Sequence, residues 1–243
     1  MQSLEYDRSF LAARILLDKI NANMIISGAF GLFEKKTVIA VGGYDNSTMG
    51  EDMELVVRLH EFSCMNRKPY KIHFAQDAIC WSQTPEKLSE LCKQRKRWQR
   101  GLFQCMWGHR KMLANPRYGA VGLLSYLYFL LYELLSPFIE LLGVLTMVLS
   151  VVMDMLNVKF MLVFLACYAL YGILLTLTAY FSRIYTIDQR LSFRELILAI
   201  IACFFETTIL RFSLAFVRAT AFVGYKKNKL NWGKLERKKM NRI

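Results

Sequence analysis

The stretch FMLVFLACYALYGILLTLTAYFS, residues 160–182, decides the fold because its 23 residues include no charged side chain. A helix needs about 20 predominantly apolar residues to cross a bilayer, so residues 160–182 are the best candidate for a transmembrane helix. Over the whole chain, 55% of residues are hydrophobic, only 21% are charged, and the mean hydropathy is +0.27. This composition excludes a disordered chain, a collagen and a disulfide-rich scaffold.

Two more apolar runs flank this stretch. The first, residues 119–153, is too long for one straight span and contains Ser136-Pro137 near its middle. Proline removes a helix hydrogen bond and kinks or divides a helix, so we expect either an interfacial helix followed by a span, or two short spans. The second run, residues 196–224, carries three charged residues, which favours an interfacial or re-entrant helix. These are Glu206, Arg211 and Arg218.

The formal net charge of +13 is concentrated in two stretches. Residues 87–117 contain nine Lys and Arg against one acidic residue, and residues 226–243 contain eight against one. Because both stretches border apolar runs, we expect them to face a membrane surface or an anionic ligand, and no nucleic acid. Lys and Arg prefer the cytoplasmic side, which predicts an even number of crossings between the two stretches. A three-span bundle with an outward basic tail is the alternative.

The composition divides the chain into three zones. Residues 1–117 alternate short apolar runs with polar turns, which predicts an α/β domain. Residues 118–224 are predicted as transmembrane and interfacial helices, and residues 225–243 as a basic cytoplasmic tail. Within the first zone, we expect Met24–Ser27 and Leu32-Phe33 to be short buried strands on either side of a loop of small residues.

An acidic pair opens a predicted helix in the segment GEDMELVVRL, residues 50–59. Leu55, Val56 and Leu59 form the apolar face of this helix. Asp52 falls in its first turn, where a carboxylate can cap the helix. If the same carboxylate faces a cleft, it can act as a general base toward a hydroxyl group. The segment alone leaves both interpretations open.

A second helix is predicted to begin with Thr84 as its N-cap and Pro85 at its first position. Further along, Gln94, Arg97 and Trp98 have the spacing that places side chains on one helical face. A guanidinium group fits a diphosphate, an indole stacks on a sugar ring, and an amide can bind either ligand. The alternative is a basic helix at the lipid surface with Trp98 as an interfacial anchor.

Taken together, these motifs resemble the membrane-embedded family 2 glycosyltransferases, which include the cellulose, chitin, hyaluronan and poly-N-acetylglucosamine synthases. The resemblance covers roughly residues 21–243 and implies the C-terminal part of a GT-A type nucleotide-sugar transferase domain, ending in an amphipathic interfacial helix, followed by a transmembrane helical region. The matching segments keep the family's order. They are Ser27-Gly28-Ala29-Phe30-Gly31, Gly42-Gly43-Tyr44, Gly50-Glu51-Asp52, Trp81-Ser82-Gln83-Thr84-Pro85-Glu86 and Gln94-Arg95-Lys96-Arg97-Trp98, the last corresponding to the signature Q-x-x-R-W.

The resemblance implies a role for each matching residue. Asp52 corresponds to the catalytic base, with Glu51 as its neighbour in the acid motif. Gln94 and Arg97 correspond to residues that hold the donor diphosphate. The acceptor saccharide would meet Trp98 and the loop of Ser27, Gly28, Ala29, Phe30 and Gly31. The implied reaction is inverting transfer from a UDP-sugar donor to a growing saccharide, helped by Mg²⁺ or Mn²⁺. It would take place at the cytoplasmic face of the cell inner membrane, in a multi-pass protein that exports the polymer.

One family feature is missing from this sequence. No D-x-D motif for metal binding occurs, and the six cysteines form no C-x-x-C pair, so no metal site is predicted. We therefore expect the chain to begin inside the catalytic domain, to be inactive alone, and to need a separate N-terminal half or synthase subunit. The alternative is a non-catalytic membrane remnant or a partner subunit of a polysaccharide synthase. Poly-N-acetylglucosamine-type and hyaluronan-type products are favoured over cellulose.

Overall fold

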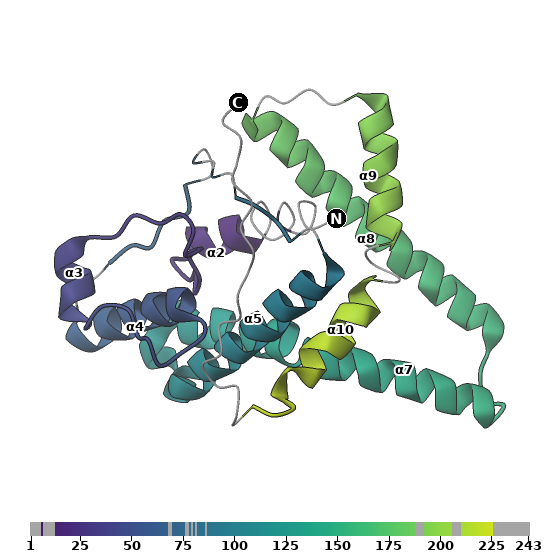
Figure 1. The fold of residues 1–243 in the computed structure, drawn as a ribbon, viewed down its shortest axis with the longest axis horizontal. Coiled ribbons are helices and arrows are strands. Elements are labelled where there is room, and N and C mark those ends of the chain that lie inside the picture. Colours follow the sequence, from purple (N-terminus) through teal and green to yellow (C-terminus); the bar gives the residue numbers. More distant parts are fainter. Residues whose placement is uncertain are drawn as a thin grey trace.

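The computed structural model describes residues 6, 13–67, 70–75, 78, 80, 82–85, 87–187, 192–205 and 210–225. In this part of the chain every regular element is a helix (Figure 1). The α-helices are α2 (Ile15–Lys19), α3 (Lys35–Ala40), α4 (Glu51–Asn66), α5 (Leu88–Gly108), α6 (Tyr126–Tyr128), α7 (Ser136–Val152), α8 (Val158–Ile187), α9 (Phe193–Phe205) and α10 (Arg211–Ala219). Short 3₁₀ turns are η2 (Arg110–Met112), η3 (Pro116–Tyr118) and η7 (Thr220–Phe222), and π-helical turns are η4 (Val121–Ser125) and η5 (Phe129–Leu134).

The predicted α/β fold of residues 1–117 is wrong, because the described residues contain no β-strand. The expected strands Met24–Ser27 and Leu32-Phe33 are irregular chain. A strand needs a neighbouring strand to pair its backbone N–H and C=O groups. Beside the first of these segments, the backbone is bonded by a side chain instead: the carbonyl oxygen of Asn23 lies 2.8 Å from His60 Nε2. A short apolar run indicates that a segment is buried, but it does not indicate whether a second strand lies beside it.

The core lies where α4 and α5 meet the segment around Met24 and the turns that follow α5. The apolar face predicted for α4 is confirmed, since Leu55 and Val56 are fully buried and Leu59 is 6% exposed. The buried side chains that pack together in this core are Ala22, Met24, Met53, Val57, Cys105, Met106, Met112, Tyr118, Val121, Tyr126 and Leu134.

The second predicted helix exists but begins later than expected. Helix α5 starts at Leu88 with Lys87 at its N-cap position, so Thr84 is not the cap. A single cap contributes only about 1 kcal/mol, whereas helices in proteins are stabilised mainly by packing of a buried face. The side chain of Leu88 is 64% exposed, and packing therefore gives no support to an earlier start. Trp81 and Glu86 of the same motif lie outside the described residues.

The apolar half of the chain bends where proline was expected to divide it. Residues Val121–Leu134 and Ser136–Val152 meet at an angle of 47°, and Pro137 lies in the first turn of α7. There the missing N–H costs little, because the first N–H groups of a helix have no partner within it. The kink predicted at Ser136-Pro137 is therefore confirmed.

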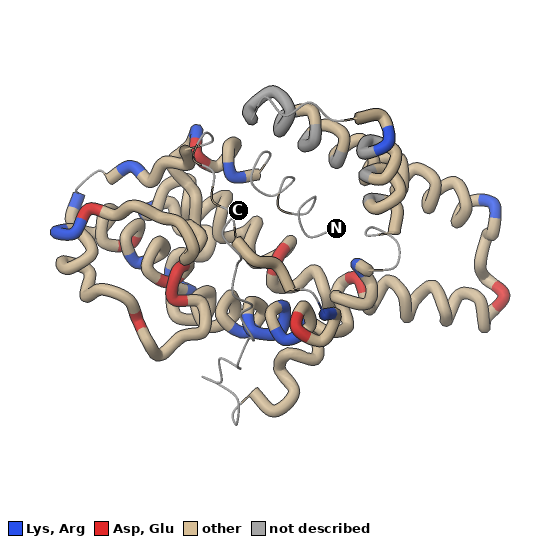
Figure 2. Tube along the Cα trace, turned by 45° about the horizontal axis from the view of Figure 1, so that its top comes forward, with Lys and Arg blue, Asp and Glu red and all other residues tan. Residues whose placement is uncertain are grey.

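Helix α7 extends away from the α4–α5 region, α8 runs back from the far end of α7, and α9 meets α8 at an angle (Figure 1). Among the described residues, one helix is by itself long and apolar enough to cross a membrane, with its most apolar window at Val158–Leu175, and the bent pair ending in α7 would make a second candidate if it is one span. Figure 2 shows these helices almost free of charge, with an acidic and a basic position near the turn that joins them. The predicted basic tail, residues 226–243, lies outside the described residues.

Helix α10 connects the two halves, because it packs against both α5 and α7 (Figure 1). Its two arginines make the polar contacts. Arg218 Nε donates to Gln99 Oε1 of α5 at 2.8 Å, and Arg211 Nη2 lies 2.7 Å from Glu140 Oε1 of α7. Both arginines of the last apolar run are thus paired with residues of neighbouring helices, whereas Glu206 lies outside the described residues.

Candidate active site

The beginning of α4 rests directly on α5 through two glycines. A Cβ atom built on Gly101 would lie 2.7 Å from Gly50 N and 2.8 Å from Gly50 Cα. The backbones can approach this closely only because neither residue has a side chain. Gln104 of α5 strengthens the contact, since its Oε1 accepts hydrogen bonds from Met49 N at 2.8 Å and from Thr48 Oγ1 at 3.2 Å.

This contact lies on the helical face that carries the predicted donor-binding residues. Gly101 follows Trp98 by three residues, Arg97 by four and Gln94 by seven, and residues at these spacings share one face of an α-helix. Glu51 and Asp52 directly follow Gly50. The structure therefore brings the acid pair and the face of Gln94, Arg97 and Trp98 into one region, although the two motifs are about 40 residues apart in the chain.

The loop Ser27–Gly31 meets the same region from a third side. Gly28 N donates to Asp52 Oδ2 at 3.1 Å, and the other carboxylate oxygen, Oδ1, accepts from Met53 N at 2.8 Å. A turn bond from Phe30 N to Ser27 O, 3.0 Å long, shapes the loop. A Cβ on Gly28 would contact Asp52 at 3.5 Å, so the backbone of this loop runs directly beside the carboxylate.

The hydrogen bonds of Asp52 bear on its two sequence-based interpretations. Gly50 occupies the N-cap position of α4, while Asp52 bonds the N–H of the adjacent residue in the first turn. Its other bond reaches the Ser27–Gly31 loop, 24 residues away in the chain. Each carboxylate oxygen has two lone pairs, so both oxygens keep the capacity to accept a further hydrogen bond from a hydroxyl group.

Glu51 is electrostatically coupled to both motifs. Burial raises the pKa of Glu51, the neighbouring Asp52 charge raises it further, and the Arg97 guanidinium opposes the shift. Arg97 therefore lies close enough to Glu51 to act on its pKa, as expected from the proximity of α5 and the acid pair. A cation and two carboxyl groups at one helix crossing form a polar site that can accept a proton on one side and bind an anion on the other.

The indole of Trp98 is partly accessible, with 37% of the residue exposed. Tyr6 stacks against it with ring centroids 6.4 Å apart and an angle of 26° between the planes. The guanidinium carbon of Arg95 lies 4.7 Å from the centroid of the Trp98 ring. The cation–π contact and the stacked Tyr6 ring hold the indole beside the site while part of it stays accessible.

Sequence analysis missed two residues of this region. Gly101 forms the α4–α5 contact. The sequence indicated it only as a glycine inside a predicted helix, a position that glycine often occupies because of close packing. Arg14 is the second: burial lowers its pKa to about 10, while electrostatic interactions with Asp52, Tyr6 and Glu133 oppose that change. A mostly buried guanidinium near Asp52 adds a second cation to the site. Its signal was a charge within an otherwise apolar run.

A cation site is not formed by the residues described. Among them, no group of three or more His, Cys, Asp or Glu side chains is arranged to hold a metal ion. The described residues therefore do not fit the divalent ion that the resemblance implies.

The chain matches glycosyl transferase family group 2 over residues 1–223. It therefore belongs to this family of glycosyltransferases, and membership implies a sugar donor and an acceptor. Among curated proteins, it is similar to the poly-beta-1,6-N-acetyl-D-glucosamine synthase of Staphylococcus aureus (strain COL), with 37% identity over 90 residues that cover 37% of this chain and 19% of the synthase. No solved structure matches the chain significantly.

A second relative is the poly-beta-1,6-N-acetyl-D-glucosamine synthase of Staphylococcus epidermidis (strain RP62A), which is 31% identical over 115 residues. The match covers 47% of this chain and 25% of that synthase. The similarity to these relatives thus spans a quarter of their length or less.

Proposed function

We propose that this chain carries the acid motif and the diphosphate-binding helix of an inverting glycosyltransferase that extends a saccharide at the cytoplasmic face of the cell inner membrane. The donor is a UDP-sugar, and the product passes across the bilayer through the apolar helices. The observation that carries the proposal is the contact of Gly50 with Gly101, since it brings Glu51-Asp52 onto the face of α5 that presents Gln94, Arg97 and Trp98.

Asp52 acts as the general base in this proposal. Its carboxylate accepts the proton of the acceptor hydroxyl while the hydroxyl oxygen forms a bond to the anomeric carbon of the donor. The bonds from Gly28 N and Met53 N orient both carboxylate oxygens before the acceptor arrives. Glu51 adds negative charge beside it and is paired electrostatically with Arg97.

Arg97 and Gln94 bind the leaving group. As the bond between the anomeric carbon and the diphosphate oxygen breaks, negative charge grows on UDP, and a guanidinium group stabilises that charge through charge-assisted hydrogen bonds. Both side chains are partly buried, which strengthens such an interaction relative to water. The divalent ion belongs to the proposal as a cofactor, with ligands other than the residues described.

Trp98 and the Ser27–Gly31 loop bind the acceptor saccharide. An indole face packs against the apolar face of a sugar ring, and the small residues of the loop let a sugar approach the backbone beside Asp52. We propose N-acetylglucosamine as the transferred sugar, because the similar curated proteins are named as synthases of poly-beta-1,6-N-acetyl-D-glucosamine.

The test uses membranes from cells that express the chain together with an N-terminal half that carries a D-x-D motif, because the chain is expected to be inactive alone. The membranes are supplied with UDP-N-acetylglucosamine labelled in the sugar, and they serve every sugar-transfer measurement. We expect incorporation of label into a saccharide, and we expect Asp52→Asn to reduce it by about 10²- to 10⁴-fold, the contribution of a general base. Binding of UDP to the same membranes should change little. Asp45→Asn is the matched control, because the Asp45 carboxylate accepts hydrogen bonds from Ser47 in the turn before α4 and is no part of the proposed site.

Two results would contradict the proposal in different ways. Normal incorporation by the Asp52→Asn variant would remove Asp52 as the base. Absence of both incorporation and UDP binding, with the chain co-purifying with an intact transferase, would favour a partner subunit over an enzyme.

A further inference from the structure

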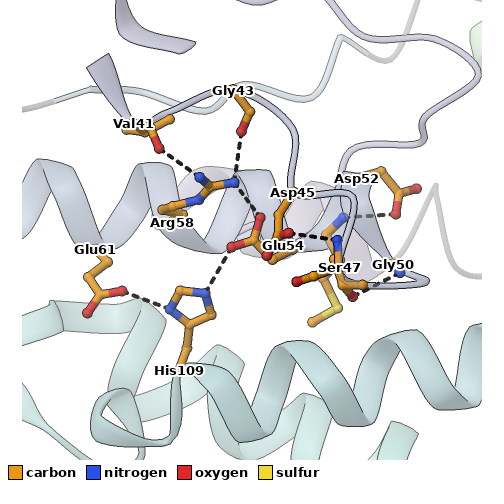
Figure 3. A network of polar contacts seen from close by, with 12 residues as sticks. Val41, Gly43, Asp45, Ser47, Gly50, Asp52, Glu54, Arg58, Glu61 and His109 are labelled. Carbon is orange, nitrogen blue, oxygen red and sulfur yellow. Dashed lines mark hydrogen bonds and ion pairs between the residues drawn. The ribbon is translucent and has the colours of Figure 1, made fainter. Parts of the chain in front are cut away.

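A largely buried charged cluster joins α4 to the C-terminal end of α5 (Figure 3). His109, at the end of α5, lies with Nδ1 2.8 Å from Glu61 Oε2 and with Nε2 3.4 Å from Glu54 Oε1. Glu54 also pairs with Arg58 at 2.5 Å. The side chains of His109 and Glu54 are only 13% and 11% exposed. These four residues are called the His109 cluster below.

The geometry of the cluster favours the doubly protonated form of His109. A neutral imidazole has one nitrogen that carries a lone pair, and in this arrangement that lone pair would face a carboxylate oxygen. Burial lowers the pKa of His109, but hydrogen bonds and charge interactions with Glu54 and Glu61 raise it more, so the net shift is upward. The Cys105 thiol, which lies near Glu54, stays neutral because burial raises its pKa.

The cluster also reaches the turn of Gly42-Gly43. Arg58 Nη1 donates to Val41 O at 2.7 Å and Nη2 donates to Gly43 O at 2.8 Å. The turn needs glycine, since φ is +91° at Gly42 and +74° at Gly43. One side of Glu54 therefore holds this turn through Arg58, and its other side holds α5 through His109.

Besides the core packing of its buried face, helix α4 has two closer attachments to α5. Near its start, the Gly50–Gly101 contact brings the backbones together, and Gln104 bonds the residues just before α4. Further along, His109 binds Glu54 and Glu61, which are seven residues and about two helical turns apart. Asp52 lies between the first attachment and Glu54, so a change in the angle of α4 displaces its carboxylate.

We propose that His109, as an imidazolium, is a positioning residue that fixes α4 on α5 and thereby sets Asp52 against the face of Gln94, Arg97 and Trp98. This inference rests on the proposed function for its catalytic consequence. Loss of the proton removes one of the two hydrogen bonds from His109 to Glu54 and Glu61, leaves these two carboxylates with Arg58 as the cation of the cluster, and releases the angle of α4. Because the pKa of His109 is raised by folding, its stabilising contribution is present below the ordinary histidine pKa and is lost as pH rises through the raised pKa.

The first measurement is independent of sugar transfer. Hydrogen exchange of the amides of α4 is followed in the detergent-solubilised chain at one fixed pH. We expect His109→Gln to speed exchange in α4 by about tenfold, because hydrogen bonds to a charged group are lost. His73→Gln is the matched control: the His73 side chain is 76% exposed and pairs with Asp18, outside α4 and α5.

The second measurement is the pH profile of sugar transfer in membranes. We expect kcat of the unmodified chain to fall as pH rises above neutrality, kcat of His109→Gln to be reduced by about tenfold at neutral pH, and KM for the donor to change little. His109→Arg keeps a positive charge at every pH tested, so it should restore kcat at alkaline pH. A merely structural role of the ring would not produce this rescue.

The outcomes separate the inference from the proposed function. Unchanged exchange of α4 in His109→Gln overturns the inference, whatever the transfer activity is. Faster exchange with unaltered kcat overturns the link from His109 to Asp52. If exchange is faster but the unmodified chain transfers no sugar, the attachment of α4 by His109 is upheld and the proposed function fails.

Discussion

Helices α5 and α8 are both long, yet their surroundings differ in almost every respect. Helix α5 buries polar side chains, including Gln99 at 2% exposure and Arg95 at 8%, and it contacts the rest of the chain through hydrogen bonds, a glycine backbone contact and the core residues Cys105 and Met106. Helix α8 exposes large apolar side chains along its length, such as Phe160 at 71% and Val163 at 62%. Length and helicity are therefore shared, and the difference lies in what each helix packs against.

This difference shows two ways of stabilising a helix in one chain. The partners of α5 are other parts of the chain, so each polar group needs a matching group at a defined place. The apolar side chains of α8 find few partners within the described residues, and a hydrocarbon environment accepts them without specific contacts. We expect substitutions at α5 to act through geometry, and substitutions at α8 to act through polarity.

The largest effect is expected at the glycine contact of α5. Gly101→Val places a side chain against the backbone of Gly50. A backbone cannot move aside by changing a side-chain rotamer, so the two helices must shift apart. We expect sugar transfer in membranes to fall at least about a hundredfold, because displacements of about 1 Å at a catalytic site have effects of that size. Gly108→Val is the control on the same helix, since a Cβ there meets no atom within 4 Å. Equal losses in both variants would contradict the importance of the α4–α5 contact.

A charge in α8 should act on membrane insertion instead. Leu165→Arg is expected to cost about 2.5 kcal/mol of insertion free energy at the centre of a span, and to increase the fraction of chain released from membranes by alkaline carbonate. Leu32→Arg introduces the same charge at a position that is 99% exposed in the loop before α3, and it should leave extraction unchanged. Full retention of the Leu165→Arg chain in membranes would argue against α8 as a span.

Helix α10 offers a smaller and more selective comparison. Arg218→Ala leaves the Oε1 atom of the buried Gln99 without its arginine donor, and we expect a loss of about 2 kcal/mol in the free energy of unfolding. Arg211→Ala removes a pair in which the arginine side chain is 48% exposed, and should cost less than about 1 kcal/mol. Thermal unfolding in detergent measures both. A larger effect of Arg211→Ala would reverse the ranking drawn from burial.

The sequence predicted some features of the fold well and failed on others for an identifiable reason. The uncharged stretch 160–182 falls within α8, and Ser136-Pro137 marks the bend, because length, polarity and proline geometry are local properties. The strands expected at Met24–Ser27 and Leu32-Phe33 were wrong, and so was Thr84 as a helix cap. Those predictions needed knowledge of a distant neighbour.

The candidate site divides in the same way. Its residue types and their helical spacing were visible in the chain, including the face of Gln94, Arg97 and Trp98. Their assigned roles stay predictions. The contribution of Gly101 could not be seen, since a glycine in a helix has no pattern that identifies the backbone it touches. His109 also escaped attention, because its glutamate partners lie 48 and 55 residues earlier in the chain.

By itself, the sequence determined the order of the motifs, the apolar helices and the position of the bend, since these depend on side chains close together in the chain. Only the tertiary structure decided that the N-terminal part has no sheet in the residues described, that α4 meets α5 at Gly50 and Gly101, and that His109 lies between two glutamates. The physical reason is that these contacts join residues about 50 positions apart, and their energies depend on close packing and burial that arise only when the chain has folded.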